Sequence, residues 1–317
     1  MAVLNLGVLS DKVKGDILEG VVLIKDYSIK KTKNGKDYID GVMQSGSVVK
    51  FKIWSGALCD SFINEDYTGC ICDISGGVDE YQGVKSLILH ECVAVEGYSL
   101  SQFLEVKYNK EGYFNSFKTL LDNNLSDKGK QFLEELFYKD EELVKRFTEE
   151  FCAKSHHDNC LSGLLAHSYK MVYILHYVLP MYKELLHHEG ESEEDRKDLL
   201  FIGVALHDIG KTKEMEYGVY QPNSSVSHRF FGAEWLAKNK DFIINLYNEK
   251  WYYDLVSVML QHHGEYGDPC RTWVSYIVHN IDLFESRLQG FCQTMTESVV
   301  RSGSGDSVWL DNNNLSL

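Results

Sequence analysis

The sequence predicts a multidomain protein with separate α and β parts: a small five-stranded β-barrel at the N-terminus, followed by an all-helical bundle. Short β-rich runs divided by turn residues fill the chain from about residue 15 to 95, whereas helical periodicities dominate after residue 97. A chain of 317 residues is also long enough for two ordinary domains. We therefore expect a domain boundary near residues 97–110.

The N-terminal region has the pattern of a strand meander. Asn34-Gly35 lies between the first two β-rich runs, and this dipeptide is typical of a two-residue type I′ hairpin turn. Five short strands in about 80 residues fit a closed barrel of the OB type. We therefore assign residues 1–97 to a barrel domain. The β-rich runs span residues 20–29, 37–43, 48–54, 70–76 and 84–95.

The remainder of the chain predicts helices and polar connections. Amphipathic patterns in residues 98–155 predict a helical connector, and residues 156–300 predict a bundle. The last segment, 301–317, is polar and rich in glycine and asparagine, so we expect a flexible tail.

The composition indicates a folded protein that stays in the cytoplasm. Hydrophobic residues make up 44% of the chain and charged residues 25%, which is typical of a globular protein. Residues 1–14 lack the basic start and apolar run of a secretory signal, and the most apolar helical window, 171–186, contains charged residues and a proline. The eight cysteines include no CxxC pair, which favours reduced thiols. We therefore expect a cytoplasmic protein without a membrane span.

The net charge of −15 argues against a protein that coats nucleic acid by bulk electrostatics. Residues 1–52 differ from the rest, because they carry nine lysines against six acidic residues. Single strands bind OB barrels by stacking bases on aromatic rings and passing phosphates along lysines, although barrel aromatics are also ordinary core residues. Lys31 and Lys33 are therefore candidate substrate-binding residues. They belong to a group near the first hairpin that comprises Lys30, Lys31, Lys33, Lys36, Tyr27, Tyr38, Phe51 and Trp54.

The strongest local pattern in the helical region is the pair His207-Asp208, which ends an apolar run just before Gly210. A glycine in that place suits a helix C-terminus, so we expect both side chains where a helix stops. Such a pair can ligate one metal ion, and the second carboxylate oxygen can reach another. The dipeptide alone is common, so it carries weight only together with other residues.

Two further polar residues fall on apolar helical faces. His167 is in phase with Met171 and Leu175 on a predicted helix over residues 163–179. Asp282 continues another apolar stripe, where a carboxylate is costly unless it is paired or bound to a cation. A hydrogen-bonded core histidine is the ordinary alternative for His167.

Helix ends supply the other histidines. His228 begins a predicted helix, and His262-His263 ends another just before Gly264. Each could be a capping or surface histidine, but a shared metal site explains the whole set better than unrelated core polar groups do. The predicted metal ligands are His167, His207, Asp208, His228, His262, His263 and Asp282. No role is predicted for His90, His176, His187 and His188, which fall on a strand, an opposite helix face or an acidic loop.

This ordered set resembles that of the HD-domain phosphohydrolases, in which a histidine, a His-Asp pair, further histidines and an aspartate follow one another. The segments 33–54 and 156–167 extend the resemblance to the YhaM-type 3′→5′ exoribonucleases, which join an N-terminal OB-fold to a C-terminal HD domain. The resemblance covers most of residues 15–290. The chain departs from the family at residues 44–46 and at His279, places that usually include an aspartate.

The resemblance implies two divalent ions, and the nitrogen-rich ligand set favours Mn²⁺, with Mg²⁺, Fe²⁺, Co²⁺ or Ni²⁺ as alternatives. Asp208 would bridge the ions, and water activated by the metal would attack phosphorus. His167, His207, Asp208 and Asp282 would hold one ion, and His228 with His262 or His263 would hold the other.

Asp208 and Lys211 are the predicted catalytic residues. Lys211 would place a positive charge beside the phosphate, although it could also be an ordinary surface lysine or a helix C-terminal charge. His156 and His157 would contact the substrate at the mouth of the pocket, or they belong to an ordinary surface loop.

Three functions remain open from the sequence. The first is a 3′→5′ exonuclease on single-stranded RNA, or on DNA. The second is an HD phosphohydrolase of a free or cyclic nucleotide, with the barrel serving assembly. The third is a nucleic-acid-binding adaptor with an inert helical domain, and the intact ligand set argues against it. The expected partner is a single-stranded nucleic acid or nucleotide, and the oligomeric state is open, a homo-oligomer included.

Overall fold

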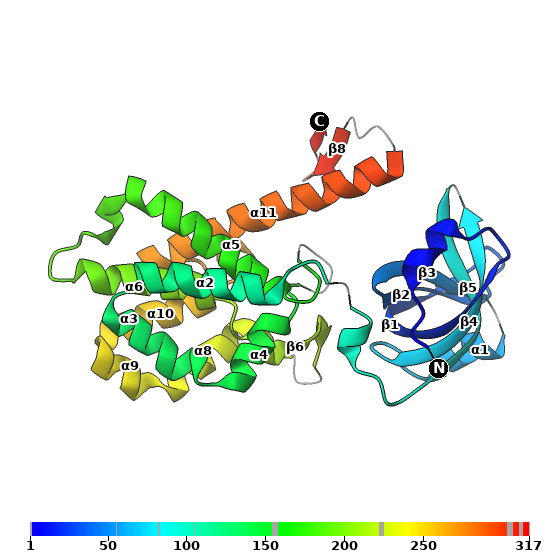
Figure 1. Ribbon diagram of the computed structural model, residues 1–317, viewed down its shortest axis with the longest axis horizontal. Helices are drawn as coiled ribbons and strands as arrows, with labels where there is room; N and C mark the ends of the chain where they lie inside the picture. The colour runs from blue at the N-terminus through cyan, green and yellow to red at the C-terminus, as the bar shows by residue number, and fades with distance from the viewer. Residues whose placement is uncertain are drawn as a thin grey trace. The chain divides into compact units, whose positions relative to one another are not determined.

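The computed structural model of the chain describes residues 2–54, 56–81, 83–104, 106–153, 158–221, 225–302, 307–310 and 313–316. Two compact units divide the chain, Met1–Val106 and Lys107–Leu317. The first is a β-barrel and the second is mainly helical, which confirms the predicted fold class (Figure 1). Among the described residues, no helix combines the length and the hydropathy that a bilayer crossing requires.

The first unit is a closed five-stranded barrel. Its strands pair in the order β1-β2-β3-β5-β4, and β4 pairs again with β1 to close the ring. This strand order, with a helix between β3 and β4, is typical of the OB-fold. The elements are η1 (Leu6–Asp11), β1 (Ile17–Lys31), β2 (Asp37–Ser45), β3 (Ser47–Ile53), α1 (Ala57–Asn64), β4 (Ile71–Tyr81), β5 (Val84–Ala94) and η2 (Leu100–Gln102).

Alternating apolar side chains fill the barrel, because successive residues of a strand point to opposite faces. Ile24, Met43 and Phe51 are fully buried in this core. Gly41 in β2 leaves room for the ring of Phe51, since an added Cβ would lie 2.6 Å from that side chain. The barrel is therefore closed around its own apolar side chains.

The hairpin between β1 and β2 differs from the predicted two-residue turn. The Thr32 amide donates to the Lys36 carbonyl at 2.8 Å, and Gly35 has a φ of +77°. Asn34 is not among the described residues with positive φ, although a type I′ turn needs positive φ at both central positions. The loop is instead a three-residue connection with glycine in the left-handed position. The predicted turn type was wrong, because the Asn-Gly dipeptide does not fix the loop length.

The second unit consists of helices and two short hairpins. Its helices are α2 (Lys110–Asn124), α3 (Asp127–Leu133), the π-helix η3 (Glu134–Tyr138), α4 (Glu141–Glu149), α5 (Gly163–Val178), η4 (Leu179–Met181), η5 (Lys183–Leu186), α6 (Glu193–Leu206), α7 (Lys211–Glu214), α8 (His228–Lys238), α9 (Lys240–Leu246), α10 (Glu249–Gln261), η6 (Gly264–Tyr266) and α11 (Trp273–Ser302). Strand β6 (Met215–Glu216) pairs with β7 (Val219–Tyr220), and β8 (Ser307–Leu310) pairs with β9 (Asn313–Ser316). The second hairpin lies in the segment predicted to be a flexible tail.

One hydrophobic core joins these helices. Phe117 of α2, Leu164 of α5 and Leu255 of α10 are fully buried in it. Helix α6 is buried on nearly all sides from Leu199 to Leu206, as expected of a helix inside a bundle. The His-Asp pair follows the C-terminal end of α6, so a helix that is buried on nearly all sides positions the candidate site.

Candidate metal centre

Five parts of the helical unit deliver the predicted metal ligands to one place. The ring centroids of neighbouring histidines lie between 4.4 and 5.5 Å apart. The structure thus brings together side chains that are separated by more than a hundred residues in the sequence. These are His167 in α5, His207 and Asp208 after α6, His228 at the start of α8, His262 and His263 after α10, and Asp282 in α11.

Asp208 lies in the middle of this cluster. Its Oδ1 atom is 3.4 Å from Nε2 of His228 and 3.4 Å from Nε2 of His262. Its Oδ2 atom is 3.3 Å from Nε2 of His207 and 2.6 Å from Nζ of Lys211. The two oxygens of this buried carboxylate therefore face two different groups of nitrogen atoms.

Two sets of possible ligand atoms together contain all seven predicted ligands. In each set, one ligand atom per residue lies within 4.8 Å of the others. The first set comprises His167, His207 and Asp282, and Nε2 of His167 is 3.3 Å from Oδ1 of Asp282. The second set comprises Asp208, His228, His262 and His263.

Backbone carbonyls orient two of the histidine rings. Nδ1 of His207 donates to the carbonyl of Val204, and Nδ1 of His262 donates to the carbonyl of Val258, each over 3.0 Å. A ring whose Nδ1 carries the proton presents an unprotonated Nε2. Both Nε2 atoms then face Asp208 as electron-pair donors.

Carboxylates orient two others. Nδ1 of His167 lies 2.6 Å from Oε2 of Glu285, and Nδ1 of His228 lies 2.8 Å from Oε2 of Glu214. Glu214 also accepts the backbone N–H of His228 over 3.0 Å, so it fixes both the ring and the start of α8. Carboxylates in this position set the ring orientation and raise the basicity of a metal-binding histidine.

Three buried polar atoms of the cluster make no hydrogen bond with the described part of the chain: Nε2 of His207, Oδ1 of Asp208 and Nε2 of His262. Buried polar groups are nearly always paired, so three unpaired atoms that converge on one space need a partner. A divalent cation is such a partner, since imidazole nitrogens and carboxylate oxygens are ordinary ligands of these ions. The donor set therefore fits a divalent metal.

The local electrostatics keep Asp208, His262 and His263 ready to bind a cation. Burial acts to raise the pKa of Asp208, but the charge of Lys211 and the neighbouring His207 outweigh it and hold this pKa well below its usual range. Burial and the neighbouring His262 lower the pKa of His263 to about 3. Burial also lowers the pKa of His262. Ligands that are already deprotonated at neutral pH bind a cation without losing a proton first.

Gly210 follows the His-Asp pair, but it does not have the left-handed conformation of the helix cap that the sequence predicted. Its φ is −64°, and α6 has already ended at Leu206. An added Cβ at Gly210 would lie 1.9 Å from the carbonyl oxygen of His228. The predicted cap was wrong, because the glycine is required by the close crossing of α8, which brings His228 to Asp208.

The other predicted site residues lie in three places. Lys211 is nearly buried and pairs with Asp208. His156 and His157 lie outside the described residues. Lys31 and Lys33 are exposed on the barrel, and Nζ of Lys31 is 2.8 Å from Oδ1 of Asp37.

The barrel aromatics divide into core and surface residues. Phe51 is fully buried, and the hydroxyl of Tyr27 donates to backbone carbonyls at the end of α1. Tyr38 and Trp54 instead pack together with ring centroids 5.1 Å apart, and Trp54 is 44% exposed. These two rings are therefore the ones of the predicted group that a base could reach.

Three residues near the cluster were not predicted from the sequence: Glu285, Glu214 and Cys152. Glu285 lies three residues after Asp282, on the same inward face of α11, so the helical periodicity could have identified it. Glu214 and Cys152 follow no such pattern, because a one-turn helix and a loop bring them to the cluster.

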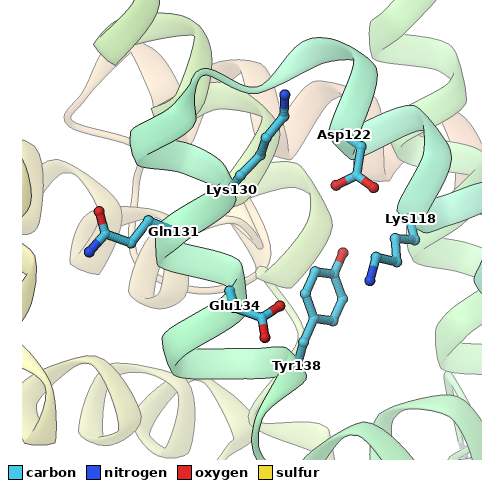
Figure 2. Close-up of a pocket in the computed structure, with 6 residues that line it drawn as sticks. All are labelled: Lys118, Asp122, Lys130, Gln131, Glu134 and Tyr138. Carbon is cyan, nitrogen blue, oxygen red and sulfur yellow. The ribbon is translucent and has the colours of Figure 1, made fainter.

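A surface hollow of about 550 Å³ lies elsewhere on the helical unit. Figure 2 shows that residues of α2, α3 and the π-helix line it, and Nζ of Lys118 lies 4.6 Å from the ring centroid of Tyr138. Its charged residues have both signs, and none of the predicted metal ligands is among them. The lining residues are Lys118, Asp122, Lys130, Gln131, Glu134 and Tyr138.

The chain is only weakly similar to solved structures of single-stranded DNA-binding proteins. A crystal structure of Rim1, a mitochondrial single-stranded DNA-binding protein from S. cerevisiae, aligns with a TM-score of 0.25 and 10% identity. The alignment covers 27% of this chain and 100% of that one. A score this low does not establish a shared fold, so the barrel assignment depends on the strand order.

Comparison with protein families and relatives agrees with the geometry of the cluster. Residues 164–286 match the model of the HD domain. The 3′-5′ exoribonuclease YhaM of Listeria monocytogenes serotype 4b (strain CLIP80459) is 28% identical over 305 residues, which cover 88% of each chain. The protein of the same name from Bacillus subtilis (strain 168) is 25% identical over 304 residues, with 86% of each chain covered. Residues 164–286 of the helical unit therefore match the HD domain, and the chain resembles the YhaM proteins over most of its length.

Proposed function

We propose that this chain is a metal-dependent phosphodiesterase that acts as a 3′→5′ exonuclease on single-stranded RNA. The observation that carries the proposal is the position of Asp208, whose Oδ1 faces Nε2 of His228 and His262 and whose Oδ2 faces Nε2 of His207. The name shared by the relatives supports the direction of cleavage and the class of substrate.

Two divalent ions, with Mn²⁺ as the favoured metal, would be held on either side of Asp208. When bound, the ions would supply a nucleophile from water at neutral pH and stabilise charge on the attacking and leaving oxygens of the phosphate. His167, His207, Asp208 and Asp282 would hold one ion, and Asp208, His228, His262 and His263 would hold the other.

The protein's own charged residues would orient the ligands and the phosphate. Glu285 and Glu214 fix the rings of two histidine ligands. Lys211 holds an ammonium group beside Asp208, where it would neutralise a nearby phosphate oxygen. Both carboxylates and the lysine are largely buried, so their positions are set by packing and by hydrogen bonds.

The barrel would hold the single strand by stacking and by charge. Tyr38 and Trp54 would provide ring faces for bases, and Lys31 and Lys33 would contact phosphates. Neighbouring acidic side chains weaken the attraction of the lysines for phosphate, because Asp37 pairs with Lys31.

A second candidate function is phosphate release from a free or cyclic nucleotide. The net charge of −15 favours it, since a small substrate needs no basic track. Both candidates use the same metal centre, so they differ in the substrate and not in the ligands.

A 5′-labelled single-stranded RNA oligonucleotide, incubated with the full chain and Mn²⁺, tests the proposal. We expect a ladder of products that shorten from the 3′ end, and we expect Asp208→Asn to abolish it together with metal binding. Asp241→Asn, an exposed aspartate in the first turn of α9, is the matched control and should keep the ladder.

Parallel reactions on free and cyclic mononucleotides separate the two candidates. Phosphate or nucleotide release from these substrates without a ladder would replace the exonuclease by the small-nucleotide enzyme. An unchanged ladder from Asp208→Asn would place the catalytic site elsewhere.

A further inference from the structure

We propose that Cys152 is a thiolate ligand of the metal centre, on the side formed by His167 and Asp208. The Sγ atom of Cys152 and one ligand atom of each of these two residues lie within 4.8 Å of one another. One ion can touch all three, since zinc bonds to sulfur and nitrogen are roughly 2.3 and 2.0 Å long. The inference rests on the proposed metal centre and adds sulfur to a ligand set of histidines and aspartates.

The backbone fixes Cys152 near His167. Its N–H donates to the carbonyl of Asp158 over 3.1 Å. Two residues earlier, the backbone carbonyl of Glu150 accepts the N–H of Leu164 over 3.0 Å. An added Cβ at Gly163 would lie only 3.0 Å from the backbone nitrogen of Cys152. The segment that carries Cys152 is therefore held against the first turn of α5, and His167 follows one turn later.

The surroundings of Cys152 are ionic. Cys59, Cys72 and Cys92 lie in the apolar core of the barrel, whereas the described apolar core of the helical unit does not include Cys152. Nζ of Lys211 lies 3.8 Å from its Sγ. Cationic neighbours are what stabilise a thiolate in proteins.

An independent observation points to a ligand in this space. Nε2 of His207, which belongs to the same group as His167, is buried and makes no hydrogen bond with the described residues, and His207 is only 1% exposed. Cys152 is itself 1% exposed, so its sulfur also has little access to water. A cation among these atoms would give partners to donors that otherwise lose their hydration without compensation.

Binding through sulfur releases one proton. The S–H bond of Cys152 breaks, the proton passes to solvent, and the electron pair left on sulfur forms the bond to the ion, with no change in oxidation state. Thiolates bind borderline and soft ions better than hard ones. A thiolate would therefore shift the preference of the centre from Mn²⁺ toward Zn²⁺, Co²⁺ or Fe²⁺.

Cobalt absorption spectroscopy on the full chain tests the assignment. Metal-stripped protein is titrated with Co²⁺, which gives visible ligand-field bands when protein ligands bind it and an additional near-ultraviolet charge-transfer band when a thiolate binds it. We expect both bands from the wild type, and only the visible bands from Cys152→Ser. Cys160→Ser is the matched control, because Cys160 is a buried cysteine just before α5, and it should keep both bands.

Competition between Co²⁺ and Mn²⁺ gives a second measurement. Cys152→Ser should lower the preference for Co²⁺ by about tenfold, at the lower end of the loss that follows removal of a supporting group around a metal. Should the serine variant fail to fold, Cys152→Ala and the wild-type spectrum decide the question.

The outcomes distinguish this inference from the proposed function. Visible bands without the near-ultraviolet band in the wild type, or a near-ultraviolet band that persists in Cys152→Ser, would overturn the thiolate ligand and leave the exonuclease intact. A cysteine-dependent band in a protein that leaves RNA uncut would keep the ligand and remove the exonuclease. Failure to bind cobalt at all would overturn both.

Discussion

His167 and Glu285 form a buried pair beside the candidate metal ligands, with Nδ1 of the ring 2.6 Å from Oε2 of the carboxylate. Nζ of Lys170 lies 3.2 Å from the other oxygen of Glu285, so this carboxylate is held from two sides. The contact turns Nε2 of His167 toward Asp282. Glu285 is thus a positioning residue, since it acts on the centre through His167.

We expect Glu285→Gln to lower the affinity for Mn²⁺ by about 10- to 100-fold, because the amide orients the ring without adding to its basicity. Titration of the metal-stripped protein against a competing chelator measures this change. At saturating metal, RNA cleavage should recover most of its rate. Glu265→Gln, at an exposed position in η6, serves as the control. An unchanged affinity in Glu285→Gln would show that the pair has no influence on the centre.

The same pair predicts a pH dependence of stability in the metal-stripped protein. Burial acts to lower the pKa of His167, but Cys152 and the carboxylates of Asp282 and Glu285 raise it well above its usual value. Burial acts to raise the pKa of Glu285, but the bond to His167 lowers it. Stability from a raised histidine pKa is complete below about pH 6.5 and is lost as the pH rises through the folded pKa. Stability from a lowered glutamate pKa is complete above about pH 4.3 and is lost as the pH falls.

Urea unfolding with chelator present, at pH 5.5 and at pH 8.5, measures this effect. The His167–Glu285 pair should make the free energy of unfolding of the wild type larger at pH 5.5 than at pH 8.5. In Glu285→Gln, the difference in this free energy between the two pH values should be smaller. The comparison of the two proteins isolates the pair from other titrating groups. An identical pH dependence in both would mean that the pair carries no charge in the folded protein.

The fold could be predicted from the sequence because its signals are local. Alternation of apolar residues marks the barrel strands, and a glycine between two strands marks the first hairpin. The length of that hairpin loop could not be predicted, because Asn34 keeps negative φ and the strands end earlier than the dipeptide suggests. The role of Gly210 could not be predicted either. It depends on the close approach of α8, which no local sequence pattern indicates.

The candidate ligands could be identified because each lies on an inward helical face or at a helix end. Helical periodicity places His167 and Asp282 inward, and the structure brings both to Asp208 and its neighbours. The residues that lie around these candidate ligands were harder to identify. Glu214 reaches His228 only because α7 turns back beside the start of α8, and Cys152 reaches the cluster through a loop, so neither position follows from sequence spacing.

Lys211→Met should slow RNA cleavage while leaving metal binding in place. The ammonium group lies 2.6 Å from Oδ2 of Asp208 and would face the phosphate, and removal of one such charge-stabilising group costs about 10²- to 10³-fold in kcat. The turnover number and the metal content of the same sample are the measurements. Lys213→Met, an exposed lysine two positions later in α7, should behave as the wild type.

Lys211→Met also has an expected effect on stability. Without metal, the variant leaves the Asp208 carboxylate buried without its nearest cation, so chelator should lower its melting temperature more than that of the wild type. A normal kcat in Lys211→Met would show that the lysine balances Asp208 and contributes nothing to the reaction.

The barrel lysines should affect RNA binding according to whether an acid already pairs with them. Nζ of Lys31 lies 2.8 Å from Asp37, whereas Lys33 projects from the exposed part of the loop. Lys33→Ala should therefore weaken binding more than Lys31→Ala does. It should also reduce the slope of log affinity against log salt by about 0.7, the value of one phosphate contact with a single strand.

Fluorescence anisotropy of a labelled RNA oligonucleotide, with chelator present to prevent cleavage, measures both effects over a range of salt concentrations. Lys14→Ala is the matched control, because Lys14 is an exposed lysine of the same unit that pairs with Asp79 over 2.7 Å. An equal salt slope in all three variants and the wild type would mean that the first hairpin does not contact phosphate. The first hairpin would then have no part in holding RNA, and the small-nucleotide enzyme would become the better account of the candidate metal centre.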